Sequence, residues 1–305
     1  MKGGHLKNQI FRTVSAAASA SVLMLVVAML VTLFVQSLPA IRRFGFFTFL
    51  TTADWNYSKE VYGALRPLFG TFLSTTLALV VAAPVALGTA VFLTELCPGR
   101  LRGVVGTALE LLAAVPSIIY GMWGLLVLAP FLEAYFQPLA AGSLGRLPLV
   151  GDFFQARLAG GVNLFTASMI LAVMIIPFIS SIAREAMSQV PPMLRESSYG
   201  LGATRWETVR WVVMPHAKMA LAGGVILAAG RALGETMAVA YVVGNRHAAL
   251  DSIFSPYTTI TSVMANEFNE AGGLQLSALF FLALLLFAAN FITLGAAKRL
   301  LGGGK

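Results

Sequence analysis

The sequence predicts an all-α, polytopic membrane protein with six transmembrane helices, and two observations lead to this fold class. The first is composition, because 58% of the residues are hydrophobic and only 11% are charged, whereas soluble domains carry about a quarter charged residues. The second is the presence of apolar runs that reach the length of about 20 residues needed to cross a bilayer. These runs cover roughly residues 15–36, 68–96, 104–130, 161–183, 217–244 and 274–296.

The first apolar run follows the basic stretch "MKGGHLKNQIFR", which is similar to the start of a signal peptide. The run is too long for the apolar part of a signal peptide, and no small-x-small cleavage site closes it. We therefore expect a retained helix. The sequence divides into a cytoplasmic N-terminal segment 1–14, a transmembrane domain 15–296 and a cytoplasmic tail 297–305.

The distribution of basic residues predicts the orientation in the membrane. Thirteen Lys and Arg residues fall on the side of the two termini, seven fall on the opposite side, and Arg231 lies within a span, which accounts for all 21. The positive-inside rule then places both termini in the cytoplasm. Because topology explains most of the basic excess, we do not expect nucleic-acid binding.

Three outer segments, at about 37–67, 131–160 and 245–273, carry aromatic residues and turn formers. Aromatic residues at these positions are typical of membrane interfaces. Long loops on a rigid scaffold also serve as binding surfaces. The outer segments are therefore either interfacial belts or a docking face for an extracytoplasmic partner.

Neither catalytic nor metal-binding residues are predicted. No GxxxxGK[ST] phosphate loop occurs, so we expect no ATP hydrolysis on this chain. The single cysteine, Cys97, allows no internal disulfide, and the three histidines are too scattered for a metal site. We expect no cofactor on this chain.

The loop at 188–216 has more internal structure than a simple connection needs. Pro191–Pro192 favours a helix start, because proline tolerates the first helical turn. Glycines follow at a spacing that suits the end of a short helix. Thr204 and Glu207 then match a capping box that begins a second helix, predicted to end at Pro215.

This loop resembles the EAA loop of ABC-transporter permeases, in which the pattern EAA, three residues, Gly, nine residues and I-x-L-P is found. Here "ESS" is followed after three residues by Gly202 and, nine residues later, by "VVMP". In that family the loop binds a cleft in a cytoplasmic ATPase. The resemblance therefore implies ATPase coupling by Glu196, Ser197, Ser198, Gly202, Ala203, Trp206 and Pro215. The alternative is an amphipathic helix on the lipid surface, for which Trp206 and Trp211 would also serve.

Two charged residues interrupt the fifth apolar run, "LAAGRALGETMAVAYVVGN". Arg231 falls near mid-membrane, where an arginine costs roughly 2.5–3.5 kcal/mol. Glu235 follows at i+4, which predicts that both side chains lie on one face of a continuous helix. The pair is either an internal ion pair that fixes helix packing or the mark of an anion route. In the second case Glu235 neutralises Arg231 at rest, and the planar guanidinium fits a tetrahedral oxyanion.

The segment "GRALGETMAV" resembles the signature of phosphate-specific ABC-transporter permeases, and the likeness extends over residues 60–300. It includes "FGTFLSTTLAL", "LLAAVPSIIYGMWG" and the Gly-Asn that ends the fifth run. The resemblance implies the type I ABC importer permease fold and a channel-forming subunit in the bacterial inner membrane. It also implies a second homologous permease, a dimer of ATPase subunits that carries ATP-Mg, and an extracytoplasmic phosphate-binding protein.

Hydroxyl groups near the start of the second span are weaker candidates for the pathway. Thr71 and Ser74 could donate hydrogen bonds to a passing oxyanion, although hydroxyls more commonly serve helix packing in membranes. The functional alternatives are the same architecture for another oxyanion, or a stand-alone channel or secondary carrier.

Overall fold

The computed structural model of the chain describes residues 2–146, 148, 151–155 and 160–302. Within these residues the chain is helical and forms no named strand, which confirms the all-α fold class. Residues 149–150 and 156–159 of the outer segment 131–160, and 303–305 of the tail, lie outside the described residues. In the described part of the chain, six helical segments are long and apolar enough to cross a membrane: Asn8–Phe44, Leu65–Leu96, Ser117–Arg146, Leu164–Ser188, Arg205–Leu233 and Gly273–Gly295.

The elements fall into long helices and short ones that connect or interrupt them. The long helices are α1 (Lys2–Phe44), α3 (Leu65–Val91), α4 (Gly99–Ala114), α8 (Leu164–Ser188), α11 (Met214–Leu233) and α14 (Gly273–Gly302). The short helices are α2 (Phe46–Thr51), α5 (Ser117–Trp123), α6 (Ala129–Phe131), α7 (Gln137–Ser143), α9 (Pro192–Gly200), α10 (Arg205–Thr208), α12 (Met237–Val242) and α13 (Ile260–Glu267).

Helix α8 forms the centre of the bundle, and it packs against α3, α4 and α11. Its most apolar stretch is 61% buried, more than that of any other candidate span in the described chain. Alanines at every fourth position of α3 are fully buried: Ala78, Ala82, Ala86 and Ala90. Small side chains let two helix backbones approach closely, and Ser180 of α8 donates a hydrogen bond across the contact to the Ala86 carbonyl at 3.2 Å.

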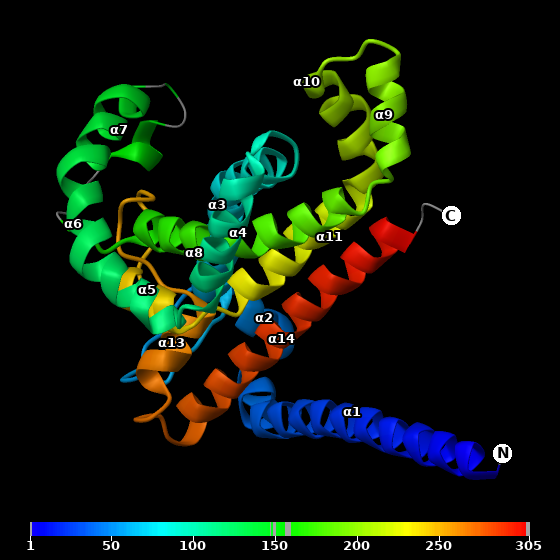
Figure 1. The fold of residues 1–305 in the computed structure, drawn as a ribbon. Coiled ribbons are helices and arrows are strands. Elements are labelled where there is room, and N and C mark those ends of the chain that lie inside the picture. The colour runs from blue at the N-terminus through cyan, green and yellow to red at the C-terminus, as the bar shows by residue number, and fades with distance from the viewer. Residues whose placement is uncertain (1, 147, 149–150, 156–159, 303–305) are drawn as a thin grey trace.

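Helix α1 leaves the bundle and projects along one edge of the molecule (Figure 1). None of its most apolar stretch is buried within the chain. Only its C-terminal end is attached, through the Ser277 hydroxyl of α14, which donates to the Gln36 carbonyl at 2.7 Å and accepts from the Ala40 amide at 3.0 Å. The chain therefore leaves this apolar helix to be covered from outside.

The third span differs from the predicted run 104–130. Helix α4 ends at Ala114, and a new helical segment begins at Ser117 and extends to Arg146. Val115 adopts an extended conformation (φ −63°, ψ 129°) because the ring of Pro116 disfavours helical geometry at the preceding residue. Apolar composition continues through this proline, so hydropathy alone does not reveal the break.

Prolines also explain the π-helical turns of the described chain. Turns at Phe92–Leu96, Gly124–Leu128, Leu132–Phe136 and Val209–Val213 each end two residues before a proline. Proline lacks the amide donor and its ring displaces the carbonyl four residues earlier, so the hydrogen-bond ladder shifts by one residue. The helix predicted to end at Pro215 therefore continues, and residues 205–233 form one helical segment.

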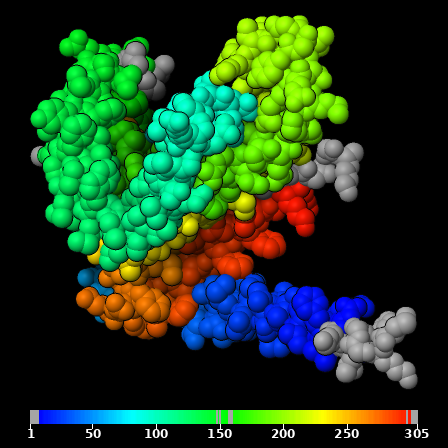
Figure 2. Space-filling view, viewed as in Figure 1, coloured from blue at the N-terminus to red at the C-terminus, as the bar shows by residue number. Residues whose placement is uncertain are grey.

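Two arms project from the bundle, one formed by the segment from α5 to α7 and the other by α9 and α10, with a notch between them (Figure 2).

The opposite region, around α13, is held by a polar cluster centred on Glu267. The Glu267 carboxylate accepts hydrogen bonds from the Trp55 indole at 2.8 Å and the Gln275 amide at 2.9 Å, and lies 3.2 Å from His247 Nε2. Burial raises the pKa of Glu267, but the contacts with His247, Trp55 and Gln275 outweigh burial and lower the pKa below its ordinary 4.5.

Candidate functional site

The fifth span is interrupted beside its charged residues. The sequence predicts a continuous span over 217–244, but α11 ends at Leu233 and α12 begins at Met237. Gly234 is the C-cap of α11. Glycine has a low helix propensity, so it favours the end of the helix at this position. Glu235 then accepts a hydrogen bond from the Ala238 amide at 3.2 Å, so its carboxylate satisfies the exposed start of α12.

This break corrects the predicted geometry of Arg231 and Glu235. Arg231 lies in the last turn of α11, and Glu235 lies in the break, so the two do not share one face of a continuous helix. Among the ion pairs of the described residues, none joins Arg231 to Glu235. The carboxylate is used locally, and the guanidinium has no carboxylate partner in this part of the chain.

Arg231 is exposed on the surface of the chain. Its guanidinium lies over the ring of Phe178 in α8, 5.8 Å from the ring centre, which is within the range of a cation–π contact. It is also close enough to interact electrostatically with Tyr120 of α5. Sequence reasoning missed both aromatic residues; Pro116, at the break before α5, was a signal close to Tyr120, whereas α8 continues through Pro177 beside Phe178.

The broken spans three and five meet next to Arg231. A side chain at Gly121 of α5 would lie 3.0 Å from the Ala238 Cα atom of α12, so glycine permits this close backbone contact. Helices α5 and α12 therefore pack closely beside the break that follows Arg231. In membrane transporters, discontinuous helices of this kind place helix ends and their partial charges at ion and substrate sites.

A cavity of about 440 Å³ opens beside the break in the fifth span. Its lining includes Gly234 and Thr236 of the break and Thr261 of α13. The Thr261 hydroxyl donates to the Glu235 carbonyl at 2.8 Å, which ties the break to α13. A largely apolar cavity, with Thr236, Thr261 and Asn269 as its polar side chains, thus adjoins the interrupted helix on the side of α13.

The other predicted pathway residues, Thr71 and Ser74, are buried inside the chain, at 4% and 2% exposure. The Thr71 hydroxyl donates to the Pro67 carbonyl at 2.7 Å and accepts from the Ile260 amide at 2.9 Å. Ser74 donates to the Thr71 carbonyl at 3.2 Å. Both hydroxyls therefore have partners within the chain, and the structure does not bring them to the exposed surface that carries Arg231. Their place on the pathway stays a prediction.

The 188–216 loop has the predicted helix–turn–helix form. Helix α9 spans Pro192–Gly200, and Gly202 adopts a left-handed conformation (φ +87°) that an L side chain rarely accepts. The capping box is present, since the Thr204 hydroxyl accepts from the Glu207 amide at 3.3 Å and the Glu207 carboxylate accepts from the Thr204 amide at 2.8 Å. The hydrogen bonds from the Thr204 amide and hydroxyl lower the pKa of Glu207 below its ordinary value, and they outweigh the small opposing effect of burial.

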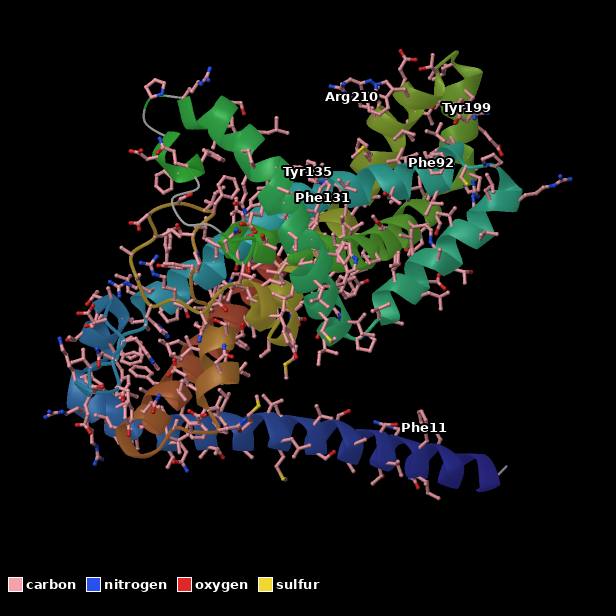
Figure 3. All side chains as sticks on the ribbon, turned by 90° about the vertical axis from the view of Figure 1, so that its left-hand side faces the viewer. Phe11, Phe92, Phe131, Tyr135, Tyr199 and Arg210 are labelled. Atoms are coloured by element: carbon pink, nitrogen blue, oxygen red, sulfur yellow. The ribbon has the colours of Figure 1, made fainter. Side chains whose placement is uncertain are left out.

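Most of the predicted coupling residues are exposed on this arm. Helix α9 has no buried residue, and Tyr199 and Arg210 lie at the projecting end of the molecule (Figure 3). The residues with exposed side-chain positions are Glu196, Ser197, Gly202, Trp206 and Pro215, whereas Ser198 and Ala203 are half-buried. Large apolar side chains such as Trp206, 62% exposed, are available to a lipid surface or to a partner.

Metal-binding groups are not gathered anywhere in the described chain, since no cluster of three or more His, Cys, Asp or Glu side chains occurs there. The functional features are instead an exposed guanidinium at a helix break and an exposed helical loop at one end of the bundle. Six apolar spans with these features in the described residues indicate a membrane permease subunit.

The chain belongs to the family of binding-protein-dependent transport system inner membrane components, which matches residues 86–301. Within this family it belongs with the PstC permeases. It is 48% identical to the phosphate transport system permease protein PstC of Haemophilus influenzae, over 93% of this chain and 90% of that protein. It is 47% identical to the PstC protein of Mesorhizobium japonicum, over 97% of this chain and 90% of that protein.

Two solved structures share the fold at low sequence identity. A chain of the MetNI methionine ABC transporter, in an inward-facing conformation, has a TM-score of 0.51 and 20% identity over 79% of this chain and 94% of that chain. A bacterial ABC transporter involved in import of the acidic polysaccharide alginate has a TM-score of 0.54 and 17% identity over 79% of each chain. The fold is therefore that of an ABC importer permease, and the protein is a multi-pass inner-membrane protein.

Proposed function

We propose that this chain is the channel-forming permease subunit of an ATP-driven importer of inorganic phosphate. The relatives that match over nearly its whole length are named as phosphate transport permeases, which supports the choice of cargo. In this proposal both termini and the α9–α10 arm lie in the cytoplasm. The α13 region then faces the extracytoplasmic side.

One observation carries the proposal: an exposed guanidinium, with no carboxylate partner among the described residues, lies where the helix of the fifth apolar run is interrupted. A charged group at this depth is costly unless it faces protein, water or a ligand. Arg231 offers a planar fork of donors that matches the oxygens of a tetrahedral oxyanion. An arriving phosphate would therefore recover part of the free energy lost by removing its hydration shell.

Glu235 has a different role from the one that the sequence predicts. Because its carboxylate accepts from the Ala238 amide at the start of α12, it fixes the break that presents Arg231. Its charge also discourages a second anion from remaining at the break, since like charges repel in a low-dielectric environment. Glu235 thus positions the pathway without neutralising Arg231 directly.

The exposed surfaces of the chain support a set of partners. A second, homologous permease of the PstA type would cover Arg231 and the unburied α1. A dimer of ATPase subunits carrying ATP-Mg would bind α9 and its flanking residues, and an extracytoplasmic phosphate-binding protein would dock on the α13 side. ATP hydrolysis would occur on the ATPase subunits, and this chain would carry neither a catalytic group nor a cofactor.

The test is phosphate uptake by proteoliposomes that contain the complete complex. We expect uptake of labelled inorganic phosphate only when ATP is on the ATPase side and the binding protein on the other. Excess sulfate should not compete, and the permease alone should pass no phosphate. Sulfate uptake at an equal rate would support another oxyanion, and ATP-independent phosphate flux through the permease alone would establish a stand-alone channel or carrier.

A further inference from the structure

A partly buried ion pair lies at the base of the α9–α10 arm, away from Arg231. Arg195, in the first half of α9, pairs with Glu95 at 3.1 Å, and the two side chains are only 19% and 8% exposed. Glu95 belongs to the π-helical turn Phe92–Leu96 that follows α3. The pair therefore joins α9 to the end of a span that is about 100 residues away in the sequence.

The same guanidinium also holds the end of α8. Arg195 Nη1 donates to the Val190 carbonyl at 2.7 Å, and Nη2 donates to the Met187 carbonyl at 2.7 Å. Carbonyls at a helix C-terminus lack partners within the helix and attract cations. A single side chain thus fastens α9 to the last turn of α8 through the Met187 carbonyl, to the connection after α8 through the Val190 carbonyl, and to the turn after α3 through the Glu95 carboxylate.

Helix α9 depends on such contacts because it has no buried residue. Its other side is fastened by the Ser198 hydroxyl, which lies 3.0 Å from the hydroxyl of Thr208 in the helical segment that leads into α11. Without Arg195, α9 would lose its side-chain contacts with α8 and with the turn after α3, and the Ser198–Thr208 contact would remain.

The surroundings of the ion pair leave room for rearrangement. A cavity of about 510 Å³ adjoins it and is lined by residues from four elements: Leu93, Thr94, Glu95, Arg102, Arg184, Glu185, Ser188 and Arg195. The Arg195 Nε atom is buried with no hydrogen-bond partner in the described chain. An unused buried donor beside an open cavity is consistent with a contact that reforms differently in another conformation.

We propose that the Arg195–Glu95 ion pair is the link that transmits movement of α9 to α3, so that α3 and α8 move as a unit with α9. The inference rests on the proposed function, because it assigns to α9 the contact with the ATPase. Arg195 and Glu95 are positioning residues here, since neither contacts phosphate or ATP.

The test compares Glu95→Ala and Glu95→Gln with the control Glu110→Ala in the reconstituted complete complex. Glu95→Ala leaves both carbonyl contacts of Arg195 in place and removes only the link to α3. Glu110 forms a more exposed ion pair with Arg184 at 2.7 Å, which joins α4 to α8 without involving α9. The readout is the amount of ATP hydrolysed per inorganic phosphate imported, measured with the amount of assembled complex.

We expect Glu95→Ala to raise this ratio about tenfold and Glu95→Gln about threefold, with assembly intact, because coupling between sites is typically 5- to 150-fold. The control should stay within about twofold. An unchanged ratio in Glu95→Ala, or an equal rise in the control, overturns the inference. Loss of assembly in both Glu95 variants but not in the control also overturns it, because the pair would then be a folding contact. Failure of the wild-type complex to import phosphate would refute the proposed function instead.

Discussion

Two polar clusters of this chain differ in how their charges are satisfied. At the α13 end, the Glu267 carboxylate receives hydrogen bonds from Trp55 and Gln275 and contacts His247, all within the chain. At the break of the fifth span, Arg231 has an aromatic contact with Phe178 but no carboxylate partner in the described residues. The Glu267 carboxylate has its partners within the chain, although the buried His247 Nδ1 beside it has no hydrogen-bond partner in the described residues, whereas the Arg231 guanidinium is left open.

The difference separates stability from transport. A charge whose partners lie in the same chain contributes to folding, and its loss leaves buried donors unsatisfied. A charge that is exposed at membrane depth has no such role in the isolated chain, and its cost is recovered only by a neighbouring subunit, water or cargo. Variants in the two clusters should therefore change different measurements.

The largest expected effect is on transport, in Arg231→Ala. Phosphate uptake by the reconstituted complex should fall by about 100-fold, because a hydrogen bond to a charged group contributes roughly 1.5–3 kcal/mol. Complex assembly and thermal stability should not change. Arg231→Lys keeps the charge but loses the planar fork, so we expect partial activity.

The matched control is Lys218→Ala, which removes an exposed cation near the other end of the same helix, α11. It should leave uptake within about twofold, as expected for an exposed surface charge. Normal uptake in Arg231→Ala would remove the anion route from this account.

The next effect is on stability, in Glu267→Ala. The variant leaves the Trp55, Gln275 and His247 groups without their acceptor, which should cost about 2 kcal/mol. In a chain of this size, this corresponds to a decrease of about 4–8 °C in the Tm of the purified complex. Phosphate uptake at a temperature well below the Tm should be unchanged, in contrast to Arg231→Ala.

The effect of Glu267→Ala on the Tm should depend on pH. The pKa of Glu267 is lower in the folded chain than its ordinary 4.5. Its stabilising contribution is therefore complete above about pH 4.5 and is lost as pH falls through the lower folded pKa. The Tm difference between wild type and Glu267→Ala should shrink as the pH is lowered below 4.5. A difference that is the same at pH 7 and at low pH would show that the carboxylate charge does not stabilise this cluster.

The smallest expected effect is that of Gly202→Leu on the coupling between ATP hydrolysis and phosphate import. Gly202 has a φ of +87°, and a side chain in left-handed backbone costs about 1–2 kcal/mol. The strain should alter the angle of α9 and raise the ATP hydrolysed per phosphate about fivefold. Charge reversal in Glu196→Lys should act in the same direction through the exposed face of α9.

Gly200→Leu is the control for this substitution. Gly200 lies two residues away at the end of α9, has no positive φ, and has open space around its Cα atom. We expect Gly200→Leu to hydrolyse the same amount of ATP per phosphate imported as the wild type. Unchanged coupling in Gly202→Leu and Glu196→Lys would favour a helix that lies on the lipid surface.

The local features of the loop were predictable from sequence because they depend on residues close together in the chain. The capping box of Thr204 and Glu207 joins positions three residues apart, and the glycine turn needs only its own backbone freedom. The continuation of the helix through Pro215 was not predictable in the same way. It requires the π-helical turn Val209–Val213, whose buried Val209 and Val213 side chains are held by packing.

The sequence by itself determined the six apolar segments, the helical class and the spacing of the loop motif, because hydropathy and short-range hydrogen bonding are properties of neighbouring residues. Only the tertiary structure decided that the helices of the third and fifth apolar runs break at Val115 and Gly234, that Arg231 is exposed while Glu235 caps α12, and that Arg195 reaches Glu95. Such contacts join residues far apart in the chain, and their free energy depends on the burial and backbone geometry that packing creates.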